Sequence, residues 1–244
     1  DESTEVVPRK PDLSLRPLRA RGKPAIAVRA ISGGYYMIDS AMYSRDQPYR
    51  ARNRVNGVGS GGMGAKYGFS VNYGSPGGCH TFGDYAKEFP ADRPEYLSMN
   101  RNGKRIGAKD GSGPGGICLM HPEVRTLVLE RLRGYIARDR ASAAQRGFPP
   151  PAIYDISQND NHWMCQCPEC KAMSEREGSE SGPVVDFINA IADGIRAEHP
   201  EIQVQTFAYS ITEIPPRTLK PRDNVVIRIA ELNAEWGREF DLFH

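Results

Sequence analysis

The strongest constraint on the fold is an alternation of helical and strand-like hydrophobic patterns between residues 121 and 229. Apolar residues recur at helical spacing from position 124 to about Ala144. Pro122 suits the first position of a helix, and Glu123 suits its positive end. The segment 147–151, which reads Gly-Phe-Pro-Pro-Pro, ends the pattern. We therefore predict an amphipathic helix over this stretch, with its buried face at positions 124, 128, 132, 135 and 136.

Strand-like runs flank a second helical pattern. Apolar and β-branched residues dominate 153–157, 202–209 and 224–229, and each run has the length of a buried strand. A second helix is expected from about Pro183. Its apolar face would consist of Val184, Ile188, Ile191 and Ile195. Residues 158–182 follow neither pattern and are expected to form a long loop. This order of strands and helices is typical of a parallel β/α fold.

The amino-terminal part of the chain is less regular. Residues 1–24 are polar, basic and rich in proline, and we expect a linker-like tail there. Residues 25–31 are β-branched and are followed by Ser-Gly-Gly, which favours a buried strand. The glycine-rich segment 57–64 lacks the Gly-Lys-Ser/Thr of a phosphate-binding loop and favours a mobile loop. We expect residues 25–244 to form one domain that is truncated at its carboxyl-terminal end.

Composition excludes two classes of partner. No run of eighteen apolar residues occurs, so no membrane-spanning helix is predicted. The chain carries 32 Lys and Arg against 30 Asp and Glu, and a formal net charge of +2 provides no strong field for nucleic acid. The 25 glycines and 19 prolines favour long loops, where binding and catalytic residues concentrate.

Polar side chains follow the predicted strands. Ligands of parallel β/α folds bind beyond the carboxyl ends of the strands. This rule selects residues 158–163 after the first run, which are Gln158, Asn159, Asp160, Asn161, His162 and Trp163. It also selects Tyr209 and Ser210 after the second run, Glu231 after the third and, if residues 77–82 follow a strand, His80. Amides and carboxylates can hydrogen-bond sugar hydroxyls, and an indole can pack on a sugar ring. The alternative is that Asn159 and Asp160 form an Asx-turn that only opens a loop.

Asp160 and Glu231 are the candidate catalytic carboxylates. Two carboxyl groups on either side of a glycosidic bond can act as an acid and its partner, and general acid catalysis alone supplies roughly 10²- to 10⁴-fold. Glu235 competes with Glu231 for this role. The competing interpretation is that Glu231 is an exposed residue at a strand end.

Five cysteines require an explanation. Cys165, Cys167 and Cys170 form a Cys-x-Cys-x-x-Cys motif, and Cys79 and Cys118 lie far upstream. One interpretation is a structural zinc site formed by Cys118, Cys165, Cys167 and Cys170, although Cys79 or His162 would also serve as the fourth ligand. The other is a pair of disulfides with one free thiol. The sequence alone leaves both open.

Several short motifs occur in the order and spacing of one known family. They are Gly78–Phe82, Arg93–Tyr96, Gly103–Arg105, Ile117–Leu119, His121–Val124, Ser157–Asn161, Cys165–Cys170, Phe187–Asn189 and Ala208–Tyr209. Together they resemble the domain of unknown function numbered 4838, over roughly residues 25–235.

The resemblance implies a TIM-barrel-like (β/α) glycoside hydrolase fold, incomplete in this chain, from secreted or periplasmic bacterial proteins. Relatives in glycoside hydrolase family 163 are endo-β-N-acetylglucosaminidases. The resemblance therefore implies hydrolysis of glycans that contain N-acetylglucosamine, with the substrate's acetamido group as nucleophile and no cofactor required for catalysis. By position, Asp160 and Glu231 would be catalytic. The substrate-binding residues would be His80, Asn159, Asn161, Trp163 and Tyr209.

Two other functions compete with hydrolysis of a carbohydrate or a glycoprotein glycan. A non-catalytic carbohydrate-binding domain would keep the cleft and lack the acid. A zinc-stabilised structural or adhesive domain would depend on the cysteines alone.

Overall fold

A three-stranded parallel sheet is the centre of the fold. The computed structural model describes residues 73–107, 115–147 and 149–230. The strands are β3 (Ile153–Asp155), β4 (Gln203–Tyr209) and β5 (Val225–Ala230), in the order β3-β4-β5. Tyr73 forms a parallel bridge with Ile153 on the other side of β3. The three strand-like runs of the sequence are therefore confirmed as neighbours in one sheet.

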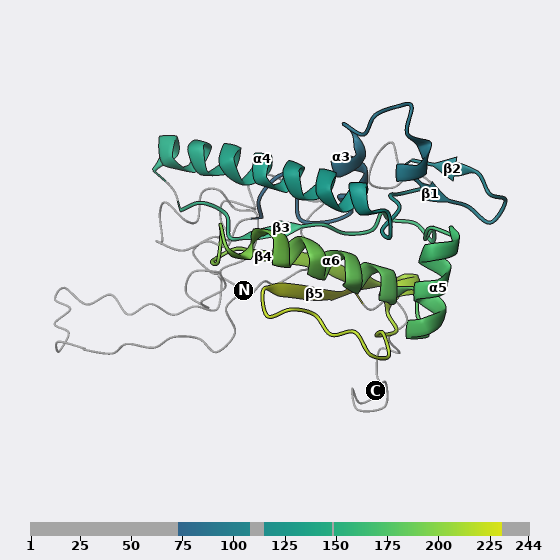
Figure 1. The fold of residues 1–244 in the computed structure, drawn as a ribbon. Coiled ribbons are helices and arrows are strands. Elements are labelled where there is room, and N and C mark those ends of the chain that lie inside the picture. Colours follow the sequence, from purple (N-terminus) through teal and green to yellow (C-terminus); the bar gives the residue numbers. More distant parts are fainter. Residues whose placement is uncertain (1–72, 108–114, 148, 231–244) are drawn as a thin grey trace, which may run out of the picture.

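Two long helices cover one face of this sheet (Figure 1). They are α4 (Pro122–Arg146) and α6 (Ser181–Arg196), and both were predicted. Pro122 occupies the first turn of α4. The helix ends at Gly147, whose φ of 66° lies in the left-handed region that glycine adopts without steric cost.

The predicted apolar faces of both helices form the hydrophobic core. In α4 they are Val124, Val128, Leu132, Tyr135 and Ile136, and in α6 they are Val184, Ile188, Ile191 and Ile195. They pack with Tyr154, Ile156 and Val204 of the sheet layer. Because each fully buried large apolar side chain contributes about 1.5–3 kcal/mol, these rows fix the helices on the sheet.

The two helices approach closely at Gly194. The Nη2 atom of Arg133 donates a hydrogen bond of 3.1 Å to the Gly194 carbonyl oxygen. A Cβ atom at Gly194 would lie 2.5 Å from Cδ2 of Leu129. The absence of a side chain at this position therefore allows α6 to lie against α4.

The prediction of an uninterrupted loop over residues 158–182 is wrong, because it contains α5 (Pro168–Glu177). Pro168 begins the helix, and Gly178, with a φ of 72°, ends it. The buried residues Cys170, Met173 and Glu177 follow at helical spacing. Only one of these three is an ordinary apolar residue, so the hydrophobic pattern gave no helical signal.

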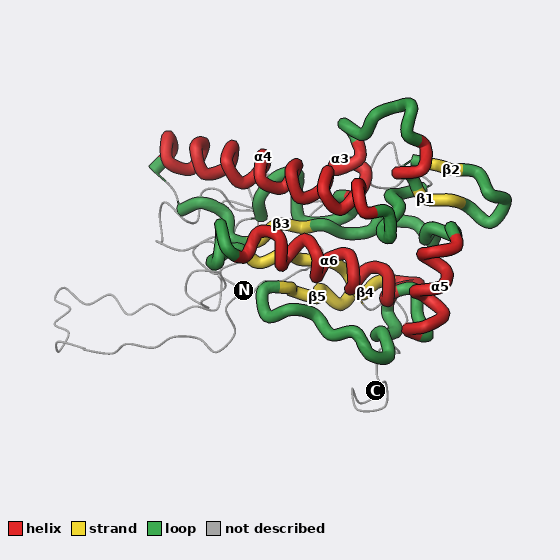
Figure 2. The backbone as a smooth tube through the Cα atoms, in the orientation of Figure 1, coloured by secondary structure: helices red, strands yellow, loops and turns green. Residues whose placement is uncertain are grey.

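Shorter elements gather near the ends of the sheet and helices. A small antiparallel hairpin consists of β1 (Ser98–Met99) and β2 (Arg105–Ile106). The remaining elements are α3 (Phe82–Ala86), η3 (Pro94–Tyr96) and η4 (Ser210–Thr212). Figure 2 shows the hairpin and α5 at the same end of the molecule, and the strand arrows of Figure 1 point towards that end.

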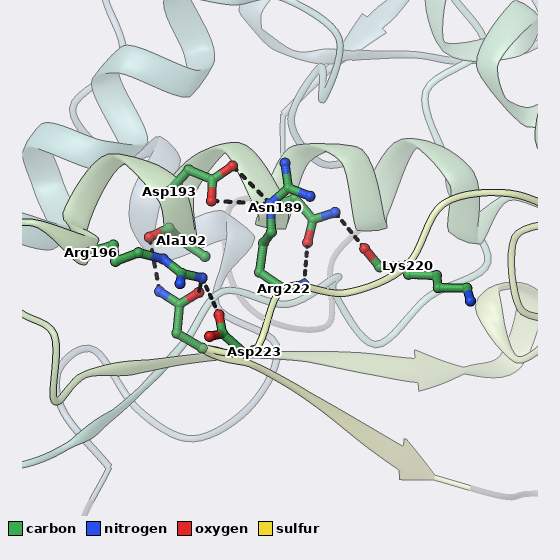
Figure 3. Close-up of polar contacts among 8 residues, drawn as sticks. Asn189, Ala192, Asp193, Arg196, Lys220, Arg222 and Asp223 are labelled. Carbon is green, nitrogen blue, oxygen red and sulfur yellow. Dashed lines mark hydrogen bonds and ion pairs between the residues drawn. The ribbon is translucent and has the colours of Figure 1, made fainter.

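Polar contacts from α6 hold the segment that leads into β5 (Figure 3). The buried side chain of Asn189 accepts a hydrogen bond from the Arg222 amide and donates one to the Lys220 carbonyl oxygen, each 2.9 Å long. Arg222 pairs with Asp193, and Arg196 pairs with Asp223. Asn189 belongs to one of the motifs singled out in the sequence, and its backbone contacts give that residue a structural role.

The fold is thus a mixed α/β structure with a parallel sheet, and the predicted fold class is confirmed to this extent. No closed barrel is present among residues 73–107, 115–147 and 149–230. The predicted strand at 25–31, the tail at 1–24 and the loop at 57–64 lie outside the described residues. Within the described part of the chain, no helix is both long and apolar enough to cross a membrane.

Candidate functional site

The sheet has an apolar face and a polar face. Tyr154 and Val204 point into the core beneath the helices. Since neighbouring residues of a strand face opposite sides, Asp155 and Gln205 lie on the other face. Phe207 and Tyr209 continue this second face along β4 towards its carboxyl end. A row of polar and aromatic side chains therefore leads to the edge where the sequence predicts a ligand site.

His80 lies against this row. Its ring meets the rings of Phe207 and Tyr209 edge-on, with centroid distances of 5.2 and 5.7 Å. Its Nδ1 donates to the Gln158 carbonyl oxygen at 2.9 Å, because that oxygen can only accept. In the neutral ring this leaves the lone pair on Nε2, which is the atom suited to accept a proton or a hydrogen bond.

Asp160 and Tyr209 meet at the carboxyl ends of β3 and β4. The Tyr209 hydroxyl donates a hydrogen bond of 2.5 Å to Oδ1 of the exposed Asp160 side chain. This hydrogen bond raises the pKa of Tyr209, so the phenol stays protonated as a donor at neutral pH. The pair joins a carboxylate in the loop after β3 to a phenol at the end of the neighbouring strand β4, 49 residues further along the chain.

A polar network fixes the two strand ends relative to each other. Oε1 of the buried Gln158 accepts from the Thr212 hydroxyl at 2.6 Å, and its Nε2 donates to the Tyr209 carbonyl oxygen at 3.2 Å. Ser210 Oγ shares a hydrogen bond of 2.7 Å with Nδ1 of His162. Gln158 and Ser210 were among the residues that the sequence selected at the strand ends, whereas Thr212 was not.

Backbone strain is concentrated at this edge. Among the described residues, the two non-glycine residues with positive φ are His80 and Ser210, each at 56°. Residues other than glycine rarely adopt this backbone conformation, and such strained positions cluster at binding and catalytic sites. Both residues contribute a ring or hydroxyl to the same group of side chains.

The loop after β3 places Trp163 outward. The side-chain oxygen of Asn161 accepts a hydrogen bond from the Trp163 amide at 2.8 Å, and its nitrogen donates to the Gly115 carbonyl oxygen at 3.2 Å. Trp163 is 43% exposed, which is high for an indole in a folded domain. Asn161 therefore supports the loop, whereas Asn159 is buried beneath it.

Asp155 is a buried carboxylate that the sequence analysis missed. Its Oδ1 accepts from Ser157 Oγ at 2.5 Å, and its Oδ2 accepts from Gln205 Nε2 at 2.7 Å. Burial raises the pKa of Asp155. Ser157 Oγ in turn accepts from the His80 amide at 2.9 Å, so Asp155 positions His80. The sequence signal that could have identified Asp155 is the presence of a charged residue inside an otherwise apolar strand.

Four cysteines form a second cluster near the same end of the molecule. Cys118, Cys165, Cys167 and Cys170 are each at most 3% exposed. Their four Sγ atoms lie within 4.8 Å of one another, and those of Cys118 and Cys167 are 3.6 Å apart. All four are free thiols, and so is the exposed Cys79. The structure thus brings Cys118 to the motif in preference to Cys79 or His162.

Polar hydrogens point at the sulfur of Cys165. The Met99 amide and Nη1 of Arg105 approach this atom at 3.3 and 3.7 Å. Hydrogen bonds from the Cys118 and Cys170 thiols lower the pKa of Cys165. Burial has the opposite effect on Cys167 and raises its pKa. The donors around Cys165 therefore favour negative charge on its sulfur.

The structure brings together most of the residues selected from the sequence. His80, Asp160 and Tyr209 lie at one edge, and the 158–163 loop carries Asn159, Asn161 and Trp163 there. Glu231 follows the last residue of β5 and lies outside the described residues.

Comparison with known proteins identifies a family but no characterised relative. The family model DUF4838, described as a domain of unknown function, matches residues 1–241. No curated protein and no solved structure matches this chain.

Proposed function

The chain belongs to the DUF4838 family of domains of unknown function, and we propose that it carries the site of a glycoside hydrolase acting on glycans that contain N-acetylglucosamine. The site lies at the carboxyl edge of β3, β4 and β5. This proposal includes the expected secreted or periplasmic location and a carbohydrate or glycoprotein glycan as partner.

The Tyr209–Asp160 hydrogen bond is the observation that carries the proposal. A carboxylate held by a phenol is a fixed acceptor with a defined direction. In substrate-assisted cleavage of an N-acetylglucosaminide, such a carboxylate would accept the acetamide N–H and orient its oxygen towards the anomeric carbon. Tyr209 would hold the carboxylate in place. Asp160 is therefore assigned the orienting role, and no metal or organic cofactor takes part in this step.

Glu231 is the proposed general acid. It immediately follows Ala230, the last residue of β5, and thus belongs to the same edge in sequence terms. A carboxylic acid there would protonate the leaving glycosidic oxygen. His80, through Nε2, would accept a hydrogen bond from a sugar hydroxyl, and the exposed face of Trp163 would pack on a pyranose ring.

The sheet is consistent with part of a (β/α) barrel. The strand position at Tyr73 and the strands β3, β4 and β5 are neighbours in chain order and all parallel. A barrel adds its strands in this consecutive order, whereas a doubly wound sheet reverses order at its switch point. We propose that these strands are consecutive members of such a barrel.

Binding without catalysis is the second candidate function, and the exposure of Trp163 favours it. An exposed indole can hold a sugar ring by stacking without help from a catalytic acid. A carbohydrate-binding domain would use the same edge, including Tyr209 and Asp160, but would not cleave the glycan.

The test is a hydrolysis and binding panel on the longest natural form of the chain. Substrates are β-N-acetylglucosaminides, N-glycans and uronic-acid glycans, with Asp160→Asn and Glu231→Gln as variants. Glu130→Gln is the matched control, because Glu130 is an exposed carboxylate of helix α4, which covers the other face of the sheet. We expect Glu231→Gln to lower kcat by about 10²- to 10⁴-fold, and the control to leave it unchanged.

The outcomes separate the two candidate functions. Turnover lost in both variants supports hydrolysis. Saturable binding without turnover, weakened by Trp163→Ala, supports the binding domain. The absence of both binding and turnover on all of these glycans would refute the carbohydrate proposal.

A further inference from the structure

We infer that Cys118, Cys165, Cys167 and Cys170 bind one zinc ion as a closed tetrathiolate site with a structural role. This inference depends only on the described cysteines and their surroundings. It does not require the carbohydrate proposal to be correct.

The separation of the four sulfurs matches a tetrahedral metal site. With Zn–S bonds of about 2.3 Å, the sulfurs at the corners of a tetrahedron lie about 3.8 Å apart. The Sγ atoms of Cys118 and Cys167 are 3.6 Å apart, and all four lie within 4.8 Å of one another. A central ion would therefore need only small side-chain movements to reach all four ligands.

The surroundings of Cys165 favour thiolates over disulfides. Four thiolates around Zn²⁺ leave a net negative charge that nearby donors must balance. The Met99 amide and the Arg105 guanidinium both point at Cys165 Sγ, and Arg105 adds a positive charge. Cys167 precedes the first residue of α5, where the positive end of a helix adds to this balance. A disulfide sulfur carries no charge and needs none of these partners.

Burial assigns the ion a structural role. Catalytic zinc keeps a coordination position open to water or substrate, whereas structural zinc is enclosed by four protein ligands. All four cysteines are buried, with exposed fractions of 1–3%. Met99 and Met120 pack against them and complete an apolar cover.

The site connects segments that are distant in the sequence. Cys118 follows Ile117, which bridges to Leu97 just before the β1–β2 hairpin, and Cys170 lies in α5. Cys165 and Cys167 end the loop that carries Asp160 and Trp163. A bound ion would hold this loop, the hairpin and α5 in one arrangement. It would thereby stabilise a loop that has few apolar residues of its own to bury.

The experiment measures zinc and thiols on the full chain produced with zinc in the medium. We expect about one zinc ion per chain in the wild type and in Cys79→Ser, the matched control at the exposed cysteine. Cys118→Ser and Cys170→Ser should lose the ion. Arg105→Gln should keep all four ligands and weaken zinc binding by about 10- to 100-fold.

Thiol titration provides the second readout. In the native zinc form only Cys79 should react with a thiol reagent, and denaturation with a chelator and no reductant should expose all five thiols. Cobalt exchanged into the wild type should give the absorption of tetrahedral thiolate coordination. Because it uses the wild type, this measurement tests for the tetrathiolate site even if the serine variants fail to fold.

Three results would overturn the inference. One is a single free thiol in the denatured, unreduced chain, which indicates two disulfides. The second is zinc retained undiminished in folded Cys170→Ser. The third is wild type that takes up neither zinc nor cobalt from a reduced state.

Discussion

Replacing Gly194 with alanine tests how closely α4 and α6 are packed. Its added Cβ would lie 2.5 and 3.2 Å from the two Cδ atoms of Leu129, about 1 Å inside the ordinary carbon–carbon contact in the closer case. Helix propensity favours alanine over glycine by about 1 kcal/mol, while overpacking costs about 1–3 kcal/mol. We expect Gly194→Ala to change the free energy of unfolding by between zero and about 2 kcal/mol, destabilising the fold.

A double-mutant cycle isolates the steric contribution. In a Leu129→Ala background the overlap is gone, so Gly194→Ala should stabilise by about 1 kcal/mol, and the coupling energy should be about 1–3 kcal/mol. Urea unfolding followed by circular dichroism gives all four free energies, provided that the slope is unchanged between variants. Equal stabilisation by Gly194→Ala in both backgrounds would refute the reasoning, because Leu129 would then move aside freely.

Three further perturbations test other parts of the structure. Leu132→Ala, in the fully buried centre of α4, should lower the free energy of unfolding by about 2–5 kcal/mol, whereas the exposed Glu130→Ala should change it by less than about 0.5 kcal/mol in the same urea assay. Gly115→Ala should cost more stability than Gly103→Ala, since both positions have positive φ but only at Gly115 would the Cβ meet a backbone oxygen, at 2.2 Å; equal losses would contradict this. Hydrogen bonds from backbone amides lower the pKa of Glu177 to about 2, below its ordinary value, so its stabilising contribution is complete above pH 4.5 and is lost as the pH falls towards 2. Thermal melts of wild type and Glu177→Gln should therefore converge over that range, and a constant difference in Tm would exclude this explanation.

Apart from α5, the helices and strands of the second half were predictable because one physical signal dominates there. The spacing of Val124, Val128 and Leu132 in α4, and of Ile188 and Ile191 in α6, is set by the need to bury one face of each helix. Nothing else in these segments competes with that signal, and the structure follows it.

The sequence indicated where the candidate site lies, but it did not indicate the contacts within it. The rule for parallel strands brought Asp160 and Tyr209 to one edge, but the hydrogen bond between them depends on strand register. Asp155 was missed because its role comes from burial beside Ser157 and Gln205, which no local pattern encodes.

The cysteine cluster shows the same division between local and distant information. Spacing grouped Cys165, Cys167 and Cys170, because three cysteines within six residues are close in any fold. Cys118 lies 49 residues from Cys167, and only the pairing around the hairpin brings it to the motif. Sequence spacing therefore predicted three members and left the fourth open.

Parallel strands lack the tight turn that sets the alignment of a hairpin, so β5 needs another device to start pairing at the correct residue. The amide group of Asn189 binds the backbone at residues 220 and 222, and Arg196 binds the side chains of Asp223 and Asn224, all directly ahead of Val225. A slip of one residue would turn every side chain of β5 to the opposite face. The contacts with α6 thus fix which residue of the chain lies at the start of β5, and with it the register of the strand.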